Sequence, residues 1–266
     1  MLKWSVLVGV SLLTLSQSAS AGGNTLIITQ EGAGNVLSVD QSAASGSTVG
    51  GLVINRASET VSFQTGTKEV PGETEGDEPT IVPVYTERPV ENLYASQADI
   101  ALQTGIGNSA KMTITGIGGF VGLSQGPSGG TNASNFATIE ALGGSSAYVG
   151  QIGSSNRATL SASDGATGTI LQDGTGNIGT VTVAGQGAQG TLSQIGSGNE
   201  NQLNVMTPGA DVSYFVDGNG LSGLVPAEVS SNAPGPITIR QTNLGFVSVG
   251  TVTALAPGVT VTQSGQ

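Results

Sequence analysis

The sequence predicts an all-β protein: a β-solenoid of stacked strand-turn-strand repeats of about 22 residues, with one acidic, proline-rich insertion. The pattern Gln-x-Gly-x-Gly-Asn occurs at residues 172–177 and again 22 residues later at 194–199. Apolar and polar residues alternate on both sides of each copy, as in half-buried strands. Glycine makes up 43 of 266 residues and aromatics only 4%, which leaves few large side chains for a thick globular core.

The composition argues against several functional classes. The chain has 18 acidic and 7 basic residues, a net charge of −11, whereas nucleic-acid binding needs many Lys or Arg contacts to phosphate. It has no cysteine and no histidine, so it lacks disulfides, a thiol nucleophile and the commonest general base and metal ligand. We therefore expect no enzyme, no catalytic residue, no metal, no cofactor and no nucleic acid.

Residues 1–21 have the pattern of a secretory signal peptide. Lys3 supplies the charged start, residues 4–15 form an apolar run, and Ala19, Ser20 and Ala21 form a small-residue cleavage site. The apolar run is too short to span a membrane, and no later stretch is long and apolar enough to do so. We expect a mature chain that begins near Gly22, is exported, and has no membrane span.

The predicted N-terminal repeats occupy residues 22–67. The first copy of the pattern has its polar positions at Gln30, Asn35 and Gln41. A loop rich in glycine and serine follows at 42–51, and a weaker copy of the repeat at 61–66. We expect these copies to form the first turns of the solenoid.

Residues 68–92 differ in composition from the rest of the chain. They contain four of the ten prolines and seven of the 18 acidic residues. Proline removes hydrogen-bond donors from a sheet, and like charges repel each other. We expect an extended, solvated insertion loop, either without a role of its own or as a loop that binds a partner.

The regular repeats are predicted over 93–205 and degenerate ones over 206–266. Between Gln125 and Asn135, residues 126–134 add five positions, which explains one long spacing. An acid replaces the glutamine at Asp217, and the Gly-x-Gly step is lost after Gln241. The repeat anchors, 21 to 26 residues apart, are Gln103, Gln125, Gln151, Gln172, Gln194, Asp217, Gln241 and Gln263.

A single repeat of two short strands buries too little surface to be stable in water. Stacking the repeats at roughly 4.8 Å per turn buries the apolar residues and places Gln over Gln and Asn over Asn. A buried amide without a partner costs about 1–3 kcal/mol, so the repeats must stay in register. The predicted structural ladder consists of Gln30, Asn35, Gln41, Gln103, Asn108, Gln125, Gln151, Asn156, Gln172, Asn177, Gln194 and Asn199.

The pattern at residues 30–35, with Leu37 and Gln41, resembles the curlin repeat of bacterial curli fibre subunits. The copies that begin at Gln103, Gln172 and Gln194 keep it, and the copy at Gln151 has serine at the second glycine. The second glutamine of the curlin repeat is mostly missing, with apolar residues in its place at Ile114, Ala162, Val183 and Val205.

The resemblance implies a secreted amyloid subunit. Such subunits cross the outer membrane unfolded, use a dedicated export and nucleation machinery, and assemble on the cell surface into fibres for adhesion and biofilm matrix. Neither end of this chain shows a capping element, since repeats start close to the expected cleavage site and continue to Gln266. We expect an unpaired edge strand to template the next molecule, which gives head-to-tail self-assembly.

Three alternatives compete with the fibre subunit. The first is a monomeric secreted β-solenoid adhesin or binding protein whose acidic insertion contacts a partner. Residues 173–177 and 217–220 resemble fragments of calcium loops, but they lack the spacing of known calcium motifs. A carboxylate-based glycosidase would need a pair of acids, and no pair stands out. The acids beside the repeats fit better as gatekeepers against premature aggregation: Glu31, Asp40, Asp99 and Asp173.

Overall fold

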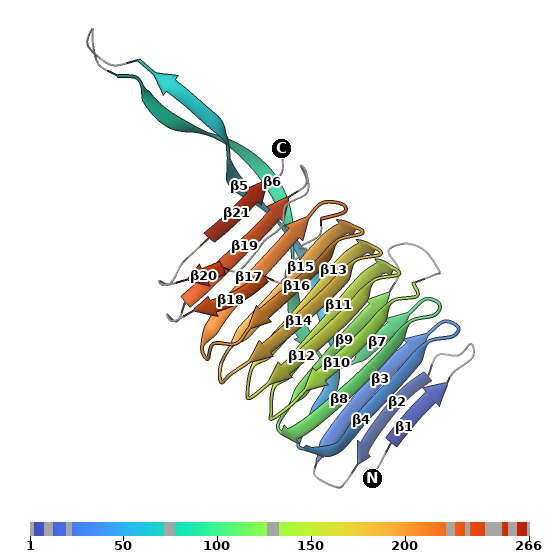
Figure 1. Cartoon of the computed structure of the whole chain (residues 1–266). Helices are drawn as coiled ribbons and strands as arrows, with labels where there is room; N and C mark the ends of the chain where they lie inside the picture. The colour runs from blue at the N-terminus through green and yellow to red at the C-terminus, as the bar shows by residue number, and fades with distance from the viewer. Residues whose placement is uncertain are drawn as a thin grey trace.

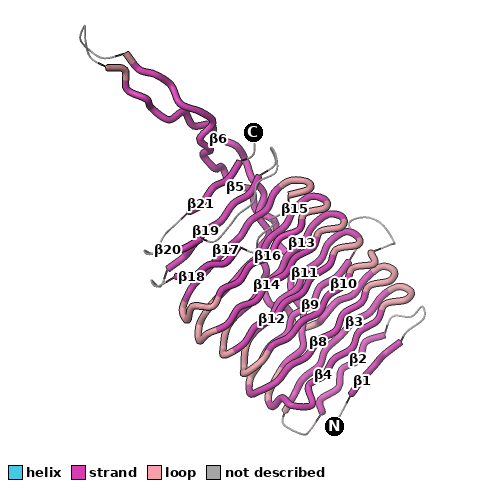
Figure 2. Tube along the Cα trace, viewed as in Figure 1, coloured by secondary structure: helices cyan, strands magenta, loops and turns pink. Residues whose placement is uncertain are grey.

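The computed structural model describes residues 3–7, 13–19, 23–71, 78–126, 133–221, 227–231, 235–242, 252–254 and 260–264. All described elements are β-strands, joined by short turns (Figure 2). Successive strands stack into a rod with two facing sheets, and a two-stranded arm extends beyond one end (Figure 1). The predicted all-β solenoid is thereby confirmed.

Each turn of the solenoid contributes one strand to each sheet. The first sheet has the order β1 (Lys3–Leu7), β4 (Val36–Ser45), β8 (Ser109–Ile117), β10 (Phe136–Ala141), β12 (Arg157–Ser163), β14 (Ile178–Ala184), β16 (Glu200–Val205), β18 (Ala227–Ser231) and β20 (Val252–Ala254).

The second sheet faces the first and carries the arm. From its C-terminal end it runs β21 (Thr260–Ser264), β19 (Gly235–Thr242), β17 (Ala210–Asp217), β15 (Gln189–Ser197), β13 (Thr167–Thr175), β11 (Ser146–Ser154), β9 (Phe120–Gly126), β7 (Ala101–Thr104), β3 (Asn24–Glu31), β5 (Thr48–Val70) and β6 (Thr80–Ala98), with β2 (Leu13–Ala19) on β3.

The strands of neighbouring turns pair in parallel with equivalent residues side by side. Gln151 lies beside Gln172, and Gln172 beside Gln194. The extra residues after Gln125 do not disturb this register, because Gln125 still pairs with Gln151. The 21- to 22-residue spacing of the glutamines is therefore one complete turn of the rod.

The core lies between the two sheets and is formed by aliphatic side chains of successive turns. Leu160, Val181 and Leu203 form one such column, fully buried. In the first sheet, the column two residues after the asparagine of each turn holds only small residues over four turns: Ala110, Ala137, Ala158 and Gly179. A Cβ at Gly179 would lie 3.0 Å from Gln194 Oε1 and 3.2 Å from Gln172 Nε2. The small residues thus leave room for the glutamine side chains.

The two glycines of each Gly-x-Gly step have different roles. Gly174 has φ 134°, and a Cβ there would lie 1.8 Å from the carbonyl oxygen of Gly196 in the next turn. Gly176 has φ 69° but no atom within 4 Å of such a Cβ. The first glycine permits close stacking of the turns, and the second provides a left-handed backbone. Ser155, with φ 59°, occupies the second position in its repeat.

The insertion is a β-hairpin, and its first and last residues differ from those that the sequence predicts. Strand β5 begins inside the second sheet, where residues 48–50 pair with residues 120–122 of β9. It then leaves the sheet, pairs antiparallel with β6 from Gly51 to Val70, and the solenoid resumes at Ala101. Residues 51–100, which we call the arm, therefore interrupt a single strand of the second sheet.

Two predictions about this region are consequently wrong. The predicted loop at 68–92 is largely paired strand, since Lys68 pairs with Val82 and Asn92 with Ala57. The weaker repeat predicted at 61–66 lies in the arm, where Val61 pairs with Arg88, and not in a solenoid turn. Alternating residues in an arm strand look like those in a solenoid strand, because both have a period of two.

The half of the arm nearest the solenoid packs along the outer face of the second sheet. Leu52 and Leu93 are buried against Leu171 and Ile195. The Leu93 amide donates to Ser193 Oγ over 3.1 Å, and Arg56 forms an ion pair with Asp173. The contacts continue to β19, where Arg240 donates to Glu59 Oε2 over 2.8 Å. Asp173 is thus engaged by the arm, in addition to any gatekeeper role.

At the N-terminal end, two strands from the predicted signal region pair with the first turn. Strand β1 runs antiparallel to β4, and β2 runs antiparallel to β3. The other residues of 1–21 lie outside the described part, and cleavage after Ala21 stays a prediction. Within the described ranges, no helix is long and apolar enough to cross a membrane.

The described parts of 206–266 continue both sheets. Here the position assigned to Asp217 is wrong by one residue, because Val216 pairs with Gln194 on one side and Gln241 on the other. A shift of one residue moves a side chain to the opposite face of a strand. Val216 therefore points into the core at the glutamine position, and Asp217 lies on the outer face.

Candidate functional site

Six glutamines form a continuous hydrogen-bonded ladder inside the rod. In each step Nε2 donates to Oε1 of the glutamine one turn further towards the C-terminus. The distances are 2.5 Å from Gln30 to Gln103, then 2.7 Å to Gln125, 2.6 Å to Gln151, 2.8 Å to Gln172 and 2.8 Å to Gln194. All six side chains are buried, with at most 4% of their surface exposed.

The same amides also tie the two sheets together. The second hydrogen of Nε2 reaches a backbone carbonyl where the first sheet begins, one half-turn away. Gln151 donates to the Phe136 carbonyl, Gln172 to that of Arg157, and Gln194 to that of Ile178, each over 3.1 Å. Each glutamine in the middle of the ladder therefore makes three hydrogen bonds, which offsets the cost of burying its amide.

A second ladder of asparagines runs along the turns that join the two sheets. The side-chain Oδ1 of Asn156 accepts from the Asn177 amide over 3.0 Å, and Asn177 Oδ1 accepts from the Asn199 amide over 3.1 Å. The Nδ2 group donates to a glycine carbonyl in the next turn, from Asn177 to Gly196 over 2.8 Å. The column contains Asn35, Asn108, Asn135, Asn156, Asn177 and Asn199, and it ends at the Leu221 amide.

Asn135 belongs to this ladder although it is absent from the predicted set. It is fully buried, accepts from the Asn156 amide over 3.0 Å and donates to the Gly153 carbonyl over 3.0 Å. The signal was visible in the sequence, since removing the five extra positions after Gln125 restores the ordinary Gln-to-Asn step.

Gln41, by contrast, lies outside both ladders, so its assignment is wrong. It sits at an irregularity of β4, between the register pairs of Asp40 and Ala43, and is only partly buried. Its Nε2 lies 3.4 Å from the Ser47 carbonyl and 3.5 Å from that of Thr25. Gln41 thus bonds to the backbone of its own turn and not to a glutamine above or below.

The glutamine ladder stops at Val216, and a tyrosine takes over its polar contacts. The Tyr214 hydroxyl lies 2.9 Å from Asn201 Oδ1 and 2.7 Å from Gln241 Oε1. Because a hydroxyl carries one hydrogen and both neighbours are amide oxygens, it donates to one of them at a time. Burial raises the pKa of Tyr214 above its ordinary value, so the hydroxyl stays protonated at neutral pH.

One column of the second sheet runs from the first turn of the solenoid to the last described strand. By backbone register Gln263 of β21 lies beside Gln241, in the same column as Gln30 of β3. Strands β20 and β21 are the terminal strands of the two sheets at the C-terminal end of the described chain. A parallel edge strand offers unpaired N–H and C=O groups to another strand.

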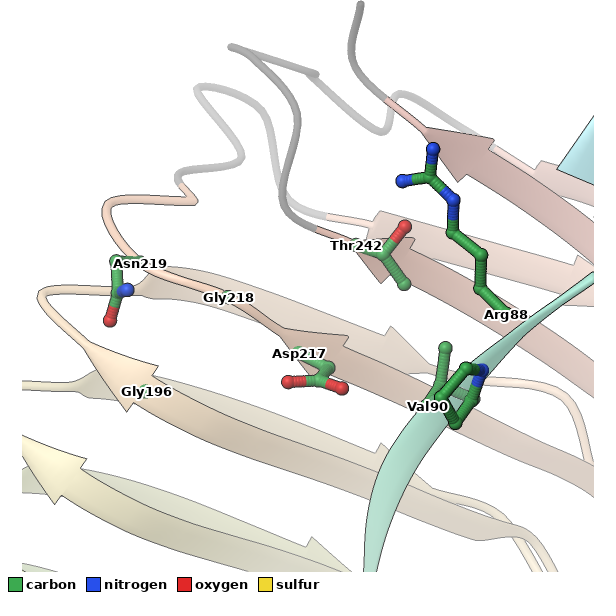
Figure 3. Close-up of a pocket in the computed structure, with 8 residues that line it drawn as sticks. Arg88, Val90, Gly196, Asp217, Gly218, Asn219 and Thr242 are labelled. Atoms are coloured by element: carbon green, nitrogen blue, oxygen red, sulfur yellow. The ribbon is translucent and has the colours of Figure 1, made fainter. Parts of the chain in front are cut away.

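One acidic side chain near a turn, Asp217, is bonded to the arm. Its Oδ2 accepts from the Glu91 amide over 3.0 Å. Beside it lies a pocket of about 340 Å³, lined by Arg88 and Val90 of the arm and by Gly196, Asp217, Asn219 and Thr242 (Figure 3). Among the described residues, Asp217 is the single carboxylate in this lining, whereas a glycosidase requires two. No group of three or more acids able to hold a metal occurs in the part of the chain that the structure describes.

Comparison with known proteins gives no relative. No protein-family model matches the chain, and neither a curated protein nor a solved structure matches it.

Proposed function

We propose that this chain is the structural subunit of an extracellular, curli-like amyloid fibre used in surface adhesion and biofilm matrix. In the fibre, β21 and β20 of one copy pair with β3 and β4 of the next, so the solenoid continues from copy to copy. The proposal includes export as an unfolded chain through an outer-membrane machinery and nucleation at the cell surface, as the resemblance to curlin repeats implies.

The repetition of one hydrogen-bond pattern along the rod carries the proposal. Every turn from Gln30 to Gln194 offers the next turn the same Nε2 donor and the same strand register. The first turn of one copy, which carries Gln30, can therefore pair with the last turn of another copy, where Gln263 occupies the ladder position by backbone register. Such in-register stacking of strands and amides is the arrangement found in cross-β fibres.

The test uses purified protein that begins at Gly22. We expect fibres in electron microscopy, thioflavin fluorescence and a strong fibre-diffraction reflection at about 4.7–4.8 Å along the fibre axis. A protein that stays monomeric at high concentration, with the solenoid intact by circular dichroism, would rule out the fibre subunit.

The runner-up is a monomeric binding protein, and the exposed outer half of the arm favours it. Ile81 and Tyr85 are 65% and 58% exposed there. Replacing residues 67–83 by a short turn separates the two functions, since Gly66 and Val84 already face each other. Fibres should survive this deletion if the chain is a fibre subunit, whereas surface binding should be lost if the arm is the binding element.

A further inference from the structure

The outer face of the second sheet contains one column of residues that the arm covers only in part. The column, here called the outer column, is Thr29, Leu102, Ser124, Gly150, Leu171, Ser193, Phe215 and Arg240, each in register with the next. From Leu171 to Arg240 it is at most 8% exposed, because the arm lies on it. Leu102 lies on the N-terminal side of the covered stretch, and its side chain is 37% exposed.

Contacts at both ends of the covered stretch show that the arm runs along the rod. A Cβ at Gly150 would lie 2.6 Å from Ile54 Cδ1 and 2.9 Å from Leu52 Cδ1, so β5 crosses β11 there. Seven residues after Leu52, Glu59 bonds to Arg240 of β19. Seven extended residues span about 23 Å, and the four steps from β11 to β19 span about 19 Å, so the arm runs along the rod at an angle of about 35° to its axis and advances about 2.7 Å per residue.

The rest of the arm extends past the last turn (Figure 1). Described residues 66–71 and 78–81 are exposed, as are 83–89. They include apolar side chains at Ile81, Val84 and Tyr85, with exposed fractions of 65%, 40% and 58%. The same part carries charges of both signs, at Lys68, Glu69, Glu78, Glu87 and Arg88.

We propose that this outer half of the arm is a binding surface for a second copy of the chain and fastens consecutive subunits together. The inference rests on the proposed head-to-tail fibre. If β3 of the next copy follows β21, then β7 of that copy lies three strand spacings beyond β19, or about 14 Å. The arm passes β19 at Glu59 and its partner Val90 and advances about 2.7 Å per residue along the rod, so it reaches that level about five to six residues further, near Val84. Val84 lies on the same face of β6 as the buried Val90, whereas Tyr85 lies on the opposite face.

Val84 of one copy then lies over Leu102 of the next, in the outer column that the arm covers further along. The match is of place and of chemistry: two exposed aliphatic side chains meet in a column where the arm already covers Leu171 and Phe215. Burying both removes two apolar surfaces from water and adds a contact outside the strand ladder.

Cross-linking tests the contact directly, because the chain has no cysteine of its own. Copies beginning at Gly22 and carrying Val84→Cys are mixed with copies carrying Leu102→Cys, assembled, and treated with a short bis-maleimide. We expect the peptide pair 84–102 by mass spectrometry. The control replaces Leu102→Cys by Ile178→Cys, a residue of nearly equal exposure, 38%, on the outer face of the first sheet.

Fibres with the 84–102 cross-link and without an 84–178 cross-link support the contact. Fibres that lack the 84–102 cross-link, or give both equally, overturn it and leave the proposed function standing. If no fibres form, the proposed function fails and the contact fails with it.

A second measurement does not depend on cysteine chemistry. Leu102→Ser should raise the concentration of free monomer left at the end of assembly by about tenfold, as expected when burial of one large aliphatic side chain is lost. Ile178→Ser should leave it unchanged. Equal effects of the two substitutions would also overturn the contact.

Discussion

At the scale of single residues, the buried amides in the middle of the ladder are stable because each has a partner above, a partner below and one across the core. Gln172 accepts from Gln151 and donates to Gln194, each over 2.8 Å. Gln194 has the first of these bonds and the link across the core, but Val216 follows it in the column. A residue in the middle of the ladder therefore supports one more ladder bond than the residue at its end.

This difference predicts unequal effects of the same substitution. Gln172→Leu should destabilise the protein by about 1 kcal/mol more than Gln194→Leu, because it leaves two ladder partners unpaired and not one. Both variants nearly preserve side-chain volume, so the comparison isolates the hydrogen bonds. Urea unfolding of freshly purified, dilute protein measures it, and equal midpoints would contradict the ladder as a source of stability.

At the scale of elements, the turns set the distance between strands. In four turns the first glycine of Gly-x-Gly faces a carbonyl of the next turn, and a Cβ added to it would lie only 1.8–2.0 Å from that oxygen: Gly32, Gly153, Gly174 and Gly196. The second glycine has more room, since no atom lies within 4 Å of such a Cβ at Gly176 or Gly198. Both sterics and a positive φ therefore favour glycine at the first position, whereas backbone conformation alone favours it at the second.

Alanine substitutions should show the additional steric cost at the first position. Gly174→Ala should cost about 3 kcal/mol or more, because the backbone of one of the two turns must move. Gly176→Ala should cost only about 1 kcal/mol, the penalty of a left-handed conformation for a residue with a Cβ. Ser155 shows that a side chain is accepted at the second position. Urea midpoints compare the variants, and a larger loss for Gly176→Ala would refute this assignment.

The sequence predicts the turn length and most of the ladder because these depend on a short pattern that repeats. It fails where a choice depends on distant contacts. Val216 and Asp217 are neighbours, and only pairing with Gln194 decides which one points inward. The arm begins at Gly51 because β6 pairs with it from far along the chain, and its strands alternate like those of the solenoid. The composition of 68–92 marks the outer part of the arm, but not the part that packs on the sheet.

At the scale of the whole molecule, the arm packs so closely on the rod at Gly150 that no side chain would fit between them. Gly150 lies beneath Leu52 and Ile54, and a Cβ added to it would lie 2.6 Å from Ile54 Cδ1. Gly150→Val should lift the start of the arm from β11 and leave the inward ladder intact, because residue 150 faces outward. Limited proteolysis should then cut within 51–100 at least several-fold faster.

The control for this prediction is Gly66→Val in the outer half of the arm, where nothing lies within 4 Å of a Cβ. It should leave the cleavage rate of residues 51–65 unchanged. Equal protection of the Gly150→Val variant and the unaltered protein would show that the arm does not depend on this close packing.

The N-terminal strands make the two ends of the rod unequal. With residues 3–7 and 13–19 present, β1 and β2 lie antiparallel on β4 and β3 and occupy the edges that would receive another copy. The opposite end, at β20 and β21, keeps its terminal strands. In the proposed fibre, a chain that retains residues 1–21 can therefore join through its C-terminal end but cannot be joined at its N-terminal end.

Such a chain should act as a stopper. Added at about one part in twenty to protein beginning at Gly22, it should shorten fibres and slow seeded growth, because one bound copy blocks one fibre end while edge pairing requires a free strand. Fibre length by electron microscopy and thioflavin kinetics measure the effect. A full-length chain carrying Leu15→Pro and Val6→Pro, whose N-terminal strands lose backbone donors, is the control and should slow growth less. If the unaltered full-length chain instead elongates seeds as well as the shortened one, the N-terminal strands do not cover the edge during assembly.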